Sequence, residues 1–197
     1  LAGPGRHDHF MLAELPPLPE HLRAAPAAGP VDADRAADPG DATAASTPQS
    51  RLGEAMHQLL EQAGVAGAPL VELRAQGWPP ARVARLARDF DITIAAARHA
   101  ALTAQRILAG EGAWAWEASA VDTAINEAPL RYQGLSLRLD RLVHCHQPPE
   151  RAGWWVLDYK SAAEPERQPA LLAQLQRYRS AVQGQTPGER VRAAFLT

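Results

Sequence analysis

The feature that most constrains the fold is a pair of strand-like stretches joined by a short turn-forming segment. The first covers residues 135–143, where leucines at every second position alternate with polar side chains. The second covers residues 154–161, which are apolar until the run ends in an acid, a tyrosine, a lysine and a serine. Residues 146–153 between them contain two prolines and a glycine, which favour a turn. We therefore predict two strands paired as an antiparallel hairpin.

This hairpin brings two acids together. If its turn is centred on Pro149, Asp140 lies directly opposite Asp158, with Cβ atoms about 5 Å apart. Carboxylates at that distance repel each other unless a cation lies between them, so the geometry predicts a metal site. Lys160 follows Asp158 by two residues and shares its face about 7 Å away. Alone, that pair would be an ordinary surface ion pair, and a register shift of one residue would separate the two acids.

Composition indicates one folded domain behind an unstructured lead. Residues 1–49 are rich in Pro, Ala, Gly and Asp, so we predict a largely disordered linker there and a domain over residues 50–197. The chain opens on Leu1, which suggests a piece of a longer protein. Its single cysteine, Cys145, excludes a disulfide framework and a four-cysteine iron–sulfur cluster. No apolar run approaches the roughly 20 residues of a membrane span, so no membrane partner is expected.

The formal net charge of −2 gives no general affinity for nucleic acid. Any DNA binding has to come from a local groove, from bound cations or from a neighbouring domain. Arg82, Arg85 and Arg88 recur at helical spacing and could line such a groove, although a solvated helix face is the favoured interpretation.

Periodicity predicts helices before residue 110 and a mixture of strands and one helix after it. The first helix should begin at Arg51, with Ser50 as its N-cap, and end at Ala63 before Gly64. Further predicted helices cover 69–76, 79–90, 92–109 and 168–182. Predicted strands cover 123–132, 135–145, 153–161 and 191–196.

Five short motifs occur in a fixed order along the chain. They are Gly53 with His57, Glu127 with Pro129, Leu139-Asp140-Arg141, Asp158-Tyr159-Lys160-Ser161, and Gln174 with Tyr178. Their order and spacing resemble the RecB-like branch of the PD-(D/E)xK nuclease superfamily, and specifically the C-terminal nuclease domain of AddA-type helicase-nucleases. The resemblance covers about residues 51–197. It implies an α/β, restriction-endonuclease-like fold in which helices flank a small mixed sheet, with an extra helical part at the N-terminus.

The resemblance also implies an activity and partners. The domain would be a divalent-metal-dependent deoxyribonuclease, an exonuclease acting in double-strand-break repair and recombination. A UvrD-like ATP-dependent helicase would precede it in the full-length chain, a second helicase-nuclease subunit could complete the complex, and the location would be the bacterial cytoplasm. No phosphate-binding Gly-x-x-x-x-Gly-Lys-Ser/Thr loop occurs within these 197 residues.

The residue types suit phosphodiester hydrolysis. Asp140 and Asp158 offer hard oxygen ligands for Mg²⁺, and His57 would also suit Mn²⁺. The resemblance adds the carbonyl of Tyr159 as a further metal ligand. Lys160 would orient or help to deprotonate the attacking water and offset charge on the phosphate.

Three further candidates have alternatives. Glu127 could assist as a catalytic carboxylate or be merely solvated, and Glu111, Glu117 and Asp122 compete for that role. Gln174 and Tyr178 lie one helical turn apart and could hold the site or DNA, or simply satisfy each other.

Arg138 departs from the family pattern, which has glycine two residues before the strand aspartate. Its side chain should share a face with Asp140 and either crowd the metal or reach a phosphate. This departure motivates an alternative function, that of an inactive nuclease-fold module that binds DNA ends or forms a scaffold. A site-specific restriction-type endonuclease is a weaker alternative, and RNA remains open as a substrate.

Overall fold

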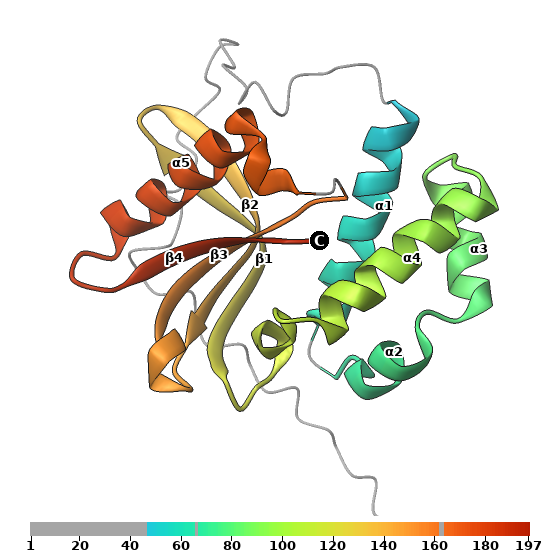
Figure 1. Cartoon of the computed structure of the whole chain (residues 1–197), viewed down its shortest axis with the longest axis horizontal. Coiled ribbons are helices and arrows are strands. Elements are labelled where there is room, and N and C mark those ends of the chain that lie inside the picture. The colour runs from blue at the N-terminus through green and yellow to red at the C-terminus, as the bar shows by residue number, and fades with distance from the viewer. Residues whose placement is uncertain (1–46, 66, 162–163) are drawn as a thin grey trace, which may run out of the picture.

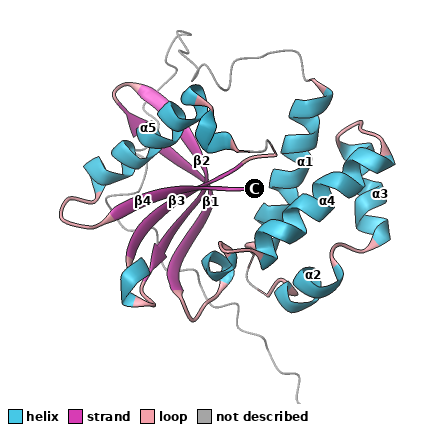
Figure 2. Ribbon diagram, viewed as in Figure 1, coloured by secondary structure: helices cyan, strands magenta, loops and turns pink. Residues whose placement is uncertain are grey.

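The computed structural model describes residues 47–65, 67–161 and 164–197. A four-stranded mixed sheet in the order β1-β2-β3-β4 stands between α5 and a layer of helices around α1 and α4 (Figure 1). The helices are α1 (Pro48–Ala63), α2 (Leu70–Gln76), α3 (Pro80–Asp89), α4 (Ile94–Ala109) and α5 (Pro169–Gln185). The strands are β1 (Val121–Tyr132), β2 (Leu135–Cys145), β3 (Gly153–Tyr159) and β4 (Val191–Leu196). This arrangement confirms the predicted fold class (Figure 2).

The predicted helix start at residue 51 is wrong. The N-cap is Thr47, whose hydroxyl accepts a hydrogen bond from the backbone N–H of Ser50, and Pro48 opens α1. A proline fits there because its missing N–H would have had no partner in the first turn. Residues 1–46 of the predicted linker lie outside the described residues. None of the helices in the described ranges is long and apolar enough to cross a membrane.

The strand register agrees with the predicted hairpin. The antiparallel β2–β3 pairs run from Arg141 opposite Leu157 to Cys145 opposite Gly153, which is a hairpin centred on residue 149. Gly153 begins β3 with φ 113°, and a Cβ there would clash with the carbonyl oxygen of Arg190. Only glycine tolerates this position, so the start of β3, and with it the register, is well defined.

In the β1–β2 hairpin, the side chains that point towards α5 change from one alternating set to the other part-way along the strands. Leu139 and Leu142 on β2 both pack in the cluster beneath α5, although residues three apart on a regular strand point to opposite faces. On β1, Ile125 and Ala128 show the same break, and Glu127 between them has a left-handed φ of 50°. The reversal lies at Glu127 and Asp140, so these acids are not carried into either hydrophobic cluster.

Candidate metal centre

A pocket of about 560 Å³ lies at this reversal, bounded by α1, the β1–β2 hairpin, the end of β3 and α5. Its lining contains the eight residues predicted from the sequence to be catalytic or to bind metal: His57, Glu127, Asp140, Asp158, Tyr159, Lys160, Gln174 and Tyr178. These residues span more than 120 positions of the chain, so only the fold brings them together.

Three carboxylates form a row across three neighbouring strands. The pairs on either side, Asn126 with Arg141 and Ala128 with Leu139, place Glu127 opposite Asp140. The β2–β3 pairing ends one residue short of Asp140, at Arg141 opposite Leu157, so the next position along β3 is Asp158. Negative charge is thus concentrated on one line across the sheet.

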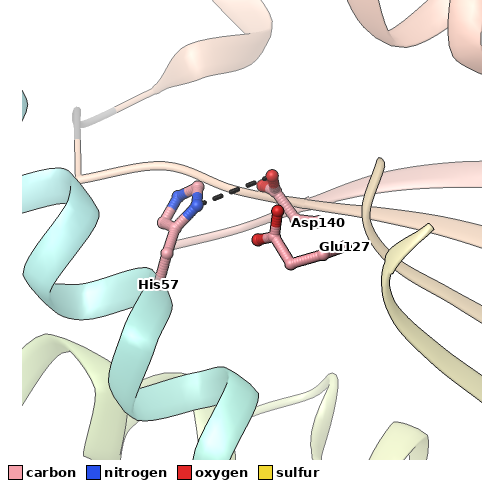
Figure 3. A group of neighbouring side chains, drawn as sticks. All are labelled: His57, Glu127 and Asp140. Carbon is pink, nitrogen blue, oxygen red and sulfur yellow. Dashed lines mark ion pairs between the residues drawn. The ribbon is translucent and has the colours of Figure 1, made fainter. Parts of the chain in front are cut away.

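His57 on α1 faces the middle of this row (Figure 3). Its Nε2 lies 3.1 Å from the carbonyl oxygen of Tyr159, which can only accept a hydrogen bond, so Nε2 carries a proton. Its Nδ1 lies 3.5 Å from Oδ1 of Asp140. Burial lowers the pKa of His57, which favours the neutral ring. A lone pair on Nδ1 then faces a carboxylate, an arrangement that a cation would relieve.

The donor set fits a divalent metal. One ligand atom each from His57, Glu127 and Asp140 can lie within 4.8 Å of one another (Figure 3). One imidazole nitrogen with carboxylate oxygens suits Mn²⁺, and the oxygens suit Mg²⁺. The group contains Glu127, which was expected to assist catalysis, and lacks Asp158, which was expected to be a ligand. Asp158 instead pairs with Lys160, and the Tyr159 carbonyl faces His57.

Burial also acts on the acids. It raises the pKa of Asp140 to about 6, although the backbone N–H of Tyr159, which donates to Oδ2 at 2.7 Å, and the charge of Lys160 oppose this change. Burial and the neighbouring charge of Asp140 raise the pKa of Asp158 to about 6, against the ion pair with Lys160. Both acids therefore resist ionisation and would gain from a cation.

The remaining candidates line the wall of the pocket. Lys160 Nζ lies 2.7 Å from Oδ2 of Asp158, which is almost fully buried. Gln174 donates a hydrogen bond of 3.0 Å from Nε2 to Oη of Tyr178. The two α5 residues therefore do satisfy each other, while both still line the pocket.

Comparison with protein-family models identifies residues 32–197 as a PD-(D/E)XK nuclease superfamily domain. The chain belongs to the PD-(D/E)XK nuclease superfamily. Members of this superfamily are generally nucleases that use divalent metals, in agreement with the donor set found here. The comparisons with curated proteins and with solved structures gave no match.

A buried arginine lies next to the acid row of this PD-(D/E)XK domain. Arg141, next to Asp140, is 2% exposed and donates hydrogen bonds to Asn126 and, at 2.9 Å, to the carbonyl oxygen of Ala115. Its guanidinium lies 4.8 Å from the ring centroid of Trp116. These contacts fix the backbone of β2 where Asp140 emerges.

The pocket of the PD-(D/E)XK domain also contains Glu54 and Ser136, for which the sequence predicted no role, and Arg138, which was expected beside Asp140. Glu54 lies three residues before His57, and that helical spacing could have identified it. Ser136 lines the pocket two residues before Arg138. Arg138 itself forms an ion pair with Glu127, so it reaches the acid row directly.

Other candidates for an acidic or basic role lie elsewhere. Glu117 pairs with Arg74, Asp122 pairs with His144, and Glu111 lines a different pocket. On α3, Arg82 donates to Gln58 and Arg85 pairs with Asp89; the pocket lining includes neither arginine, nor Arg88.

Proposed function

We propose that this domain is a divalent-metal-dependent DNA nuclease, an exonuclease attached to an ATP-dependent helicase that acts in double-strand-break repair and recombination. One observation carries the proposal: the group formed by His57, Glu127 and Asp140 lies beside the Asp158–Lys160 ion pair in one pocket. A bound metal can activate the attacking water, and a neighbouring cation can offset the charge that develops on the phosphate, so both groups suit metal-assisted phosphodiester hydrolysis.

Each residue has a defined task in this proposal. Nδ1 of His57 and the carboxylates of Glu127 and Asp140 would hold Mg²⁺ or Mn²⁺. The cation would supply positive charge to the phosphate oxygens and lower the pKa of a bound water. Tyr159 would fix the imidazole through its carbonyl and Asp140 through its N–H, so that both ligands are oriented by one peptide segment.

Lys160 would act on the attacking water. In hydrolysis the water loses one proton as its oxygen bonds to phosphorus, one bridging P–O bond breaks, and the leaving oxygen gains a proton. Asp158 holds the ammonium of Lys160 at 2.7 Å, at the wall of the pocket. The ammonium can then orient the water and offset the charge that develops on the phosphate.

The helicase partner and exonuclease action are supported by the order of the five motifs. That order resembles the C-terminal nuclease domain of AddA-type enzymes, in which the attached helicase supplies the strand to be degraded. A second helicase-nuclease subunit and the bacterial cytoplasm belong to the same proposal.

The test is cleavage of end-labelled linear single-stranded DNA with Mg²⁺ or Mn²⁺. We expect Asp158→Asn to reduce the rate by a factor on the order of 10²–10³. Asp122→Asn is the matched control, since Asp122 also pairs with a basic side chain but lies outside the pocket. Unchanged cleavage in Asp158→Asn would contradict the proposal. Circular DNA and an RNA oligonucleotide, as parallel substrates, separate exonuclease from endonuclease action and DNA from RNA.

A second candidate function is a module that binds DNA ends without cleaving them. The observation that favours it is the ion pair between Arg138 and Glu127, which engages one of the three candidate ligands. Such a module would bind linear DNA in a gel-shift assay, show no Mn²⁺ binding by calorimetry, and leave the DNA intact.

A further inference from the structure

The outer part of the β1–β2 hairpin has one buried and one exposed face. β3 pairs with β2 only from Arg141 onward, so residues 128–139 extend beyond it as a two-stranded ribbon. Leu130, Leu137 and Leu139 pack in the cluster beneath α5. Among the described residues, the side chains on the opposite face are exposed and therefore available to a ligand.

This exposed face carries a row of two arginines and a serine, which are side chains that can bind phosphate. The strand pairs Arg131 with Ser136 and Pro129 with Arg138 put these residues on one face, and all four are exposed. Arginine and serine are common partners of nucleic-acid phosphates. The row lacks acidic residues until Glu127 and Asp140, where the metal group begins.

The row is continuous with the candidate metal centre. Ser136, Arg138 and Asp140 follow one another at every second position of β2, so each step covers about 7 Å. Ser136 and Arg138 line the same pocket as His57. A nucleic-acid strand with one phosphate at the metal would therefore place its neighbouring phosphates along this row.

Arg138 has a partner that a phosphate can replace. Its side chain is 70% exposed and pairs with Glu127, which is 26% exposed. Guanidinium groups bind carboxylates and phosphates with the same forked geometry. An exposed ion pair contributes little to stability, so exchange of the carboxylate for a phosphate costs little. A metal that binds Glu127 would favour this exchange.

We propose that the exposed face of the β1–β2 hairpin binds the backbone of a single DNA strand that enters the metal centre. Arg138 binds the phosphate next to the scissile one, and Arg131 with Ser136 binds the following phosphate. This assignment rests on the proposed nuclease function and adds the path of its substrate. Because the row contacts phosphates only, binding along it does not depend on base sequence.

The test is the salt dependence of binding to a fluorescent oligo-dT strand, with Ca²⁺ in place of Mg²⁺ to limit cleavage. Each lost phosphate contact should reduce the slope of log K against log [salt] by about 0.7. We expect this reduction in Arg138→Ala and again in Arg131→Ala, and about twice as much in the double variant. Arg138→Lys should retain the slope, because it keeps the charge.

Arg85→Ala is the matched control. Arg85 is 68% exposed and pairs with Asp89, much as Arg138 is exposed and pairs with Glu127, but it lies on α3 outside the pocket. An unchanged slope in both hairpin variants, or a reduced slope in Arg85→Ala alone, would overturn the proposed path while wild-type cleavage continued. Failure of the nuclease function itself has a different signature, namely no metal-dependent cleavage by the wild-type protein.

Discussion

Replacement of the central acid of the row should stabilise the metal-free protein. Burial raises the pKa of Asp140 from 3.8 to about 6, so at pH 7.5 the native state holds a carboxylate that is costly to ionise there. A rise of roughly two pKa units corresponds to about 3 kcal/mol. Asp140→Asn removes this cost, and its side-chain oxygen can still accept the hydrogen bond from Tyr159 N–H. We expect a gain of about 1–3 kcal/mol in the free energy of unfolding.

The sign of the pH dependence follows from the same shift. Between pH 3.8 and about 6 the native state retains a proton that the unfolded chain releases. The stabilising contribution is therefore complete below pH 3.8 and lost as pH rises through about 6. In urea titrations with EDTA, the advantage of Asp140→Asn should be largest at pH 7.5 and shrink towards pH 4.

Asp91→Asn provides the control, because Asp91 is 96% exposed and pairs with Arg51 at the surface. Its effect should stay within about 1 kcal/mol at every pH. If Asp140→Asn is no more stable than wild type at pH 7.5, ionised Asp140 does not destabilise the metal-free protein and the reasoning is refuted. Added Mn²⁺ should stabilise wild type more than Asp140→Asn, because binding to the native state adds to its stability.

Further predictions concern the metal, the lysine, the buried arginine and pH. His57→Ala should weaken Mn²⁺ binding in calorimetry by at least the roughly 10- to 100-fold seen when an outer partner of a metal ligand is removed. Lys160→Met should slow single-turnover cleavage by a factor on the order of 10²–10³ while Mn²⁺ still binds; equal losses of both would contradict its role towards water. Arg141→Met should lower the free energy of unfolding in urea by about 1–3 kcal/mol, because the carbonyl oxygen of buried Ala115 and Oδ1 of Asn126 lose their donor, against about 0.5 kcal/mol or less for Arg85→Ala. The rate of cleavage should fall as pH drops below about 6, because protonation of Asp140 then competes with the metal; a rate independent of pH between 5 and 8 would contradict this.

Much of the sheet could be predicted from the sequence because its signals are local. Alternating leucines define β2, and the segment around Pro149 sets the register to β3. The N-cap of α1 was missed because Thr47 and Ser50 are both suitable caps. The choice depends on Pro48, which fits the first helical position and therefore favours the earlier threonine.

The contacts of the acid row could not be predicted in full. Sequence spacing places Asp140 opposite Asp158 but does not show the left-handed conformation of Glu127, which brings this acid to the metal group. Arg138 was expected either to crowd the metal or to reach a phosphate. Neither alternative included the ion pair that it forms with Glu127. Both features depend on the point where inward and outward side chains stop alternating along the strands. The spacing of apolar residues in the sequence does not reveal that point.

The paired reversal in the β1–β2 hairpin restricts how the length of these strands can change. The two strands switch faces together, at Glu127 and Asp140. The outer residues Leu130, Leu137 and Leu139 therefore face the same cluster as the inner residues Ile125 and Leu142. Deletion of one residue from either strand alone would turn Arg138 inward or expose the leucines under α5. Deletion of one residue from each strand, on opposite sides of the row, would restore the pairing of the inner residues. It would still leave Glu127 and Asp140 out of register with each other. Insertions and deletions should therefore be tolerated at the Gln133-Gly134 turn and excluded at the acid row.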